Sequence, residues 1–109
     1  AHALSTVCDL HHGLANGIMI DRVMTFNKPA CREKFKVLAQ TVGARDFVAW
    51  LKGLQKAVGM PKSLGAVGVK KEHLPRLVAV AVADPCHQLN PRPVSRKDFE
   101  KLFAAALRG

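Results

Sequence analysis

Side chains that could bind a metal or move protons crowd into the start of the chain. His2, Cys8, Asp9, His11 and His12 supply three imidazoles, a thiol and a carboxylate. Imidazole is the commonest metal ligand, and it also exchanges protons near neutral pH. The residue types in this segment are therefore compatible with two functions, metal binding and acid–base catalysis.

The spacing of these residues does not complete a site by itself. His11 and His12 are adjacent, so on a helix they cannot point the same way. His2 lies ten residues before His12, which suits ligands on neighbouring elements rather than one helical turn. Closed zinc sites show tighter paired spacings. A histidine at the start of a helix more commonly caps or packs than binds a metal, and Asp9 is a candidate cap for the helix that begins near His12. Residue types alone therefore do not distinguish a structural role from a metal site.

Apolar residues recur at helical spacing in several segments, and none shows convincing strand-like alternation. The Val-Ala-Val-Ala-Val run at 78–82 could imitate a strand, but its flanks continue a helical stripe. The chain is therefore expected to be all-α, a bundle of about five helices. The expected helices span 12–26, 32–42, 45–58, 72–84 and 95–107.

Local signals refine this outline. Gly13 and Gly17, four residues apart, should allow another backbone to approach. Trp50 is placed in the core, and Ser95 is expected to cap the last helix. The proline-rich segment 86–94 should form a rigid, extended connection. Residues 1–7 resemble the tail of an apolar segment, so the chain is interpreted as a fragment.

The net charge of +9, from 17 basic and 8 acidic residues, raises the question of nucleic acid. The charges are spread along the chain and no aromatic residues interleave with them, so we expect a solvated surface and no nucleic acid. A non-catalytic basic helical module that binds nucleic acid remains the alternative. The three cysteines form no disulfide framework, which fits a reducing cytoplasm. No apolar run approaches the roughly 20 residues that span a bilayer.

The stretch from His12 to Ile20, His-Gly-Leu-Ala-Asn-Gly-Ile-Met-Ile, closely resembles a motif of the iron-dependent (group III) alcohol dehydrogenases. Their pattern is His-Gly-x-Ala-Asn followed by hydrophobic residues. Met60–Leu64 with Gly68-Val69 is similar to the family's Pro-x-x-Leu…Gly-Val loop. Asp84–Cys86 with Asn90–Arg92 is similar to its Asp-x-Cys…Asn-Pro-Arg turn. The resemblance covers essentially the whole chain.

The resemblance implies a dehydroquinate synthase-like C-terminal helical domain over residues 1–109, separated from the N-terminal nucleotide-binding domain of a longer chain. It makes His12 the last of four metal ligands and His2 a catalytic proton relay. It also implies that Cys86 lines the substrate pocket, whereas catalysis by an adjacent Cys86–His87 pair is not expected. The family's other ligands, including one four residues before His2, lie outside this chain.

The implied activity is hydride transfer between an alcohol or aldehyde and NAD or NADP. Fe²⁺, or Zn²⁺ in some members, acts as the Lewis acid. The intact protein is expected to be a homo-oligomer, and the 109 residues alone should not turn over alcohol. A zinc-dependent relative, similar to glycerol dehydrogenase or dehydroquinate synthase, is the other alternative within this superfamily.

Overall fold

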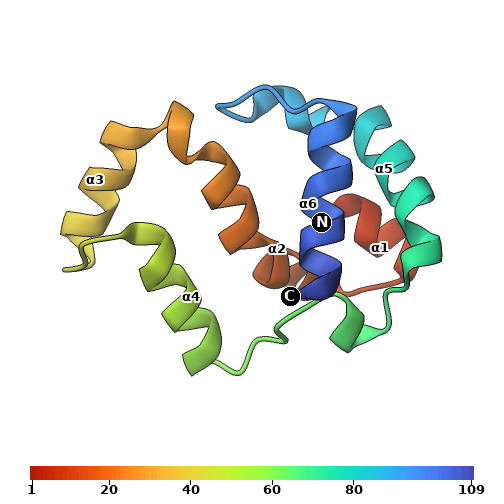
Figure 1. Ribbon diagram of the computed structural model, residues 1–109, viewed down its shortest axis with the longest axis horizontal. Coiled ribbons are helices and arrows are strands. Elements are labelled where there is room, and N and C mark those ends of the chain that lie inside the picture. Colours follow the sequence, from red (N-terminus) through yellow and green to blue (C-terminus); the bar gives the residue numbers. More distant parts are fainter.

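The computed structural model describes residues 1–109 and contains only helices, turns and loops (Figure 1). The expectation of an all-α bundle is confirmed. Four short 3₁₀ turns separate the α-helices. The six α-helices are α1 (His2–Cys8), α2 (His12–Asn27), α3 (Arg32–Thr41), α4 (Phe47–Ala57), α5 (Leu74–Ala83) and α6 (Arg96–Arg108).

All five predicted helices are present, with ends within two residues of the predicted ones. Ser95 begins α6 as predicted. Its hydroxyl accepts from the backbone N–H of Asp98, and the Asp98 carboxylate accepts from the backbone N–H of Ser95. This reciprocal capping satisfies two otherwise unpaired donors.

Two segments differ from their predictions. Residues 2–8 form an additional helix, α1, which buries Ala3 and Leu4. A seven-residue helix is not stable by itself and depends on tertiary packing, so the sequence pattern does not reveal it. The supposedly extended segment 86–94 begins instead with a 3₁₀ turn, Pro85–Leu89, because the Asp84 carboxylate accepts a hydrogen bond from the Cys86 N–H.

Helix α2 lies between two groups of helices (Figure 1). It packs against α1 and α6 on one side and against α4 on the other, while α3 contacts α4. The molecule measures 39 × 30 × 19 Å. Because a helix with its side chains is about 10–12 Å wide, the body is less than two helices thick. Most helices therefore keep one face exposed.

The hydrophobic core is divided accordingly. The main core joins α1, α2, α5 and α6 with the loop that precedes α5. Its fully buried large side chains are Leu4, Ile18, Leu64 and Leu77. A small separate cluster of Cys31, Phe35 and Val48 holds α3 against α4. The α3–α4 pair is therefore the less firmly packed part of the domain.

The prediction that Trp50 fills the core is wrong. Trp50 is 36% exposed and stacks on Phe47, with ring centroids 6.0 Å apart. Leu54 and Val58, which lie at helical spacing from Trp50 in the expected helix 45–58, are 45% and 65% exposed. Only Val48 and Leu51 of α4 are buried, because the thin body covers α4 from one side only.

A polar clasp ties the connection before α6 to the end of α2. The buried amide of Asn27 exchanges two hydrogen bonds with Asn90, at 3.0 and 2.7 Å. Asn90 also donates to the Arg92 carbonyl. The Arg92 guanidinium donates to the Phe26 carbonyl at 2.7 Å and lies 4.0 Å above the Phe26 ring. Asn90 and Arg92, which the Asn-Pro-Arg segment supplies, therefore brace this turn by hydrogen bonds.

Replacing Asn27 with Ala should destabilise the domain by about 1–3 kcal/mol, because a partly buried Asn90 amide loses its partner. The matched control Gln88→Ala removes an exposed amide on the neighbouring turn and should change stability by less than about 0.5 kcal/mol. Urea unfolding of both variants measures the difference. Equal effects would show that the clasp contributes no specific stability.

Candidate metal and proton-transfer site

A tight corner between α1 and α2 determines where the N-terminal histidines lie. Asp9 ends α1 in the left-handed conformation with φ of 54°, a geometry that Asp tolerates better than most residues. The His11 ring then begins α2, since its Nδ1 atom accepts from the Gly13 N–H at 3.1 Å. The expectation that Asp9 caps this helix is therefore wrong, and His11 has that role.

His12 is the first residue of α2, and its side chain is exposed. Neither of its ring nitrogens takes part in a hydrogen bond or ion pair within the chain. No group of three or more His, Cys, Asp or Glu residues could hold a metal ion. The exposed ring is therefore not engaged within the chain, and the chain by itself forms no metal site.

Gly17, five residues after His12, has little free space beside it. The prediction that another backbone approaches this glycine is wrong, because its neighbour is the Met60 side chain. A Cβ atom here would collide with the end of the Met60 side chain. On the same turn, the Gln55 side chain donates to the Gly17 carbonyl at 2.7 Å. The absence of a side chain at Gly17 thus leaves room for Met60, which follows α4. Together with the Gln55 hydrogen bond, this contact holds the end of α4 against α2, the helix that carries His12.

His2 and Cys86 lie on either side of one carboxylate, that of Asp84. The His2 Nε2 atom is 4.0 Å from the Asp84 Oδ2 atom, and the Asp84 Oδ1 atom accepts from the Cys86 N–H at 3.0 Å. The sequence placed Asp84 at the end of a helix and in the Asp-x-Cys turn, but it did not predict the contact with His2. Its place two residues before Cys86 was the available signal. No hydrogen bond or ion pair connects His12 to this group.

The Cys86 thiol is not arranged as a nucleophile. A hydrogen bond to Asp84 and the charge of that carboxylate raise the thiol pKa, so the reactive thiolate is disfavoured. The neighbouring His87 ring turns away, with its Nε2 atom 3.1 Å from the Val82 carbonyl and its edge against Phe99. The geometry supports the expectation that Cys86 and His87 are not a catalytic pair.

The chain is similar to known proteins along almost its whole length. Residues 1–107 match the family described as "Fe-containing alcohol dehydrogenase family, C-terminal". The chain belongs to this family. The resemblance of the segment at His12–Ile20 is thereby confirmed at the level of the family.

Individual relatives cover almost the whole chain. The probable alcohol dehydrogenase EutG of Escherichia coli K12 is 33% identical over 97% of the chain, and the lactaldehyde reductase of the same strain is 32% identical over 97%. A solved iron-containing alcohol dehydrogenase of Corynebacterium glutamicum superposes with a TM-score of 0.83 at 28% identity, over 97% of the chain. The chain spans only 28%, 31% and 30% of these proteins, respectively.

The Asp84 carboxylate should stabilise the fold in a pH-dependent way. Its pKa is lowered below the ordinary value of 3.8, first by hydrogen bonds from Cys86 and then by nearby imidazoles. A lowered pKa contributes stability above the unfolded value, and this is lost as the pH falls through the folded value. Asp84→Asn should therefore unfold at lower urea than the parent at pH 7, and the gap should close in acid.

Asp9→Asn is the matched control, because the exposed Asp9 carboxylate makes no hydrogen bond or ion pair. The measurement is the urea midpoint of unfolding for the parent and for both variants, from pH 7 into the acid range. A gap for Asp84→Asn that persists unchanged into strong acid would contradict a charge-based contribution.

Proposed function

We propose that the chain forms the C-terminal domain of a metal-dependent oxidoreductase that transfers hydride between an alcohol or aldehyde and NAD or NADP. The observation that carries the proposal is His12, the histidine of the segment that resembles the family's His-Gly-x-Ala-Asn motif. It lies on the first turn of α2, and neither ring nitrogen makes a hydrogen bond within the chain. An alcohol dehydrogenase, a lactaldehyde reductase and an NAD-dependent methanol dehydrogenase among the relatives support the class of substrate and cofactor.

His12 would hold a divalent metal, Fe²⁺ or Zn²⁺, together with ligands outside this chain. Such a metal acts as a Lewis acid toward the substrate oxygen. This chain would contribute the placement of the backbone that carries His12, because the His11 cap holds the first turn of α2 and the Gln55 hydrogen bond to the Gly17 carbonyl holds the next turn. With that backbone fixed, only the His12 side chain must lose freedom when it binds.

His2 would move the proton that accompanies hydride transfer. Its ring is 63% exposed, so the Nε2 atom can exchange a proton with water. The Asp84 carboxylate, 4.0 Å away, offers an opposite charge whenever the ring is protonated. Cys86, bound to the same carboxylate, would line the substrate side without reacting.

His12→Ala in the full-length protein should weaken metal retention by more than about 100-fold, since a direct ligand should matter more than the outer partners of a ligand. His11→Asn is the control, because Asn can cap the helix in place of the imidazole. Metal analysis after dialysis, with melting curves for both variants, gives the readout. Full metal occupancy and activity in His12→Ala would overturn the proposal.

His2→Gln in the same protein should lower the turnover number by about 100-fold, the scale of an acid–base contribution. Metal content should not change, because the ring lies on another helix. The pH dependence of turnover distinguishes a relay from a structural role, since removal of the relay should flatten its acidic limb. An unaltered pH profile would exclude His2 from proton transfer.

A further inference from the structure

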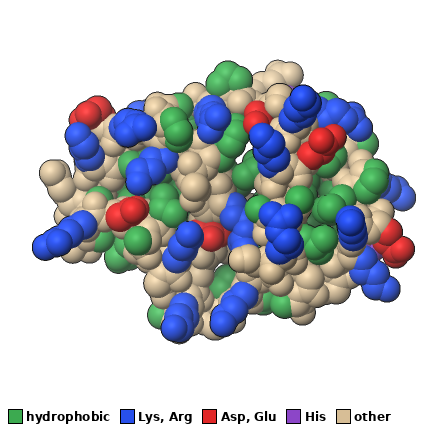
Figure 2. All heavy atoms as spheres, viewed as in Figure 1, with side chains coloured by type: hydrophobic (Ala, Val, Ile, Leu, Met, Phe, Trp, Pro, Cys, Tyr) green, Lys and Arg blue, Asp and Glu red, His purple; other side chains and the backbone are tan.

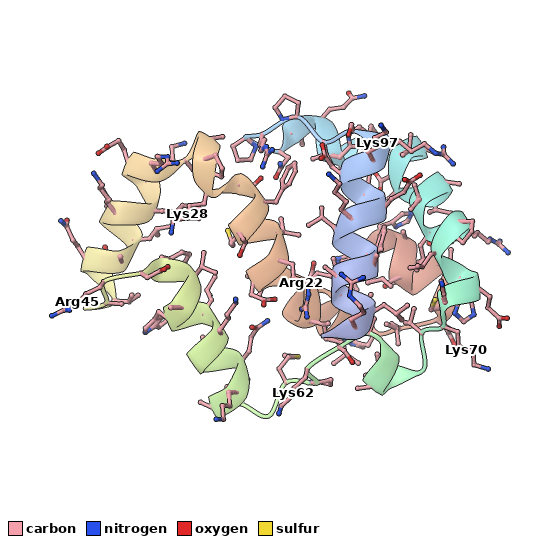
Figure 3. All side chains as sticks on the ribbon, viewed as in Figure 1. Arg22, Lys28, Arg45, Lys62, Lys70 and Lys97 are labelled. Atoms are coloured by element: carbon pink, nitrogen blue, oxygen red, sulfur yellow. The ribbon has the colours of Figure 1, made fainter.

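An open cleft of about 1040 Å³ lies between α2, α4 and α6. Ile18 and Arg22 of α2 lie at its base. Figure 2 shows Lys and Arg side chains gathered around this hollow, and Figure 3 places Arg22 between α2 and α6. The volume is at the upper end of the range that small-molecule sites occupy.

Cations from distant parts of the sequence converge on this cleft. Lys52 and Lys56 come from α4, Lys101 and Arg108 from α6, and Lys62 from the loop after α4. None of these five side chains takes part in an ion pair. Charges that are dispersed along the sequence therefore act on one shared space.

The other charged groups of the cleft are already engaged. Asp21 lies 3.3 Å from Arg22 and also accepts from Gln55, while Arg22 donates to the Lys62 carbonyl. The Asp98 carboxylate is held by Ser95 at the start of α6. Both carboxylates keep their charge, but seven Lys and Arg residues line the cleft against these two acidic residues, so the lining carries a net positive charge.

We propose that this cleft binds a small ligand that carries at least two phosphate groups. Lys52 and Lys56 are four residues, or about 6 Å of helix, apart, and Lys101 and Arg108 are seven residues, or about 10 Å, apart. Two rows of cations on facing walls match an extended anion better than a single point charge. Lys presents three rotatable donors and Arg five, which suits phosphate oxygens.

The shape of the cleft favours a small anion over a nucleic acid strand. Phe26 is the one aromatic side chain that lines it, and the Arg92 guanidinium covers that ring at 4.0 Å. Single-strand binding relies on free aromatic faces on which bases stack. The cleft offers charge and depth without such a face.

The test titrates the full-length protein with inorganic pyrophosphate in a calorimeter at constant ionic strength. Orthophosphate is the comparison ligand, and a twelve-nucleotide DNA strand is the competitor. The cleft variant Lys56→Gln/Lys101→Gln should bind pyrophosphate about tenfold more weakly than the parent, since each lost charge contributes up to about 1 kcal/mol. Lys34→Gln/Lys97→Gln is the matched control, with the same charge change outside the cleft.

Saturable binding that favours pyrophosphate over orthophosphate, and that only the cleft variant weakens, would support the proposal. Three results would overturn it: no saturable binding, equal weakening in both double variants, or binding that survives the cleft variant unchanged. Binding of the DNA strand that the cleft variant weakens, while pyrophosphate itself shows no saturable binding, would overturn the proposal and assign the cleft to nucleic acid instead. Melting curves of both double variants serve to check that the exposed substitutions leave the fold intact.

Discussion

The position of α2 between two separate cores is the constraint on which the rest of the domain depends. Ile18 and Met19 belong to the main core, while Met24, further along, packs against the small cluster under α3. The polar clasp from Asn27 to Asn90 then fastens the far end of the helix. One helix therefore supports both groups, and displacement at either end would disturb the residues at the other.

The same placement explains both candidate sites. The first turn of α2 reaches the surface, so His12 is presented outward with no partner in the chain. The middle of α2 faces the space that α4 and α6 leave open, where Asp21 and Arg22 lie. Helices α4 and α6 both pack on α2 but make no extensive contact with each other, so the space between them stays open. The exposed first turn of α2 and the open cleft both follow from packing arranged around one helix.

Family membership and geometry contribute different parts of the functional argument. The match over residues 1–107 identifies what kind of domain this is. The geometry shows which side chains are free to act: an unpaired imidazole at His12, and a carboxylate at Asp84 shared by His2 and Cys86. The chain spans about 30% of the length of these relatives, so the comparison and the geometry both concern one domain.

Local sequence determined the five longer helices, because apolar residues recur at helical spacing along them and local signals such as Gly43 and Gly59, both with positive φ, end α3 and α4. The local motif at His12 also determined the family. Tertiary structure decided what depends on distant partners. Helix α1 forms only against the main core, Trp50 stays at the surface because nothing covers α4, and Asp84 meets His2 across 82 positions of sequence. These outcomes arise from packing between segments, and no local pattern of residues encodes them.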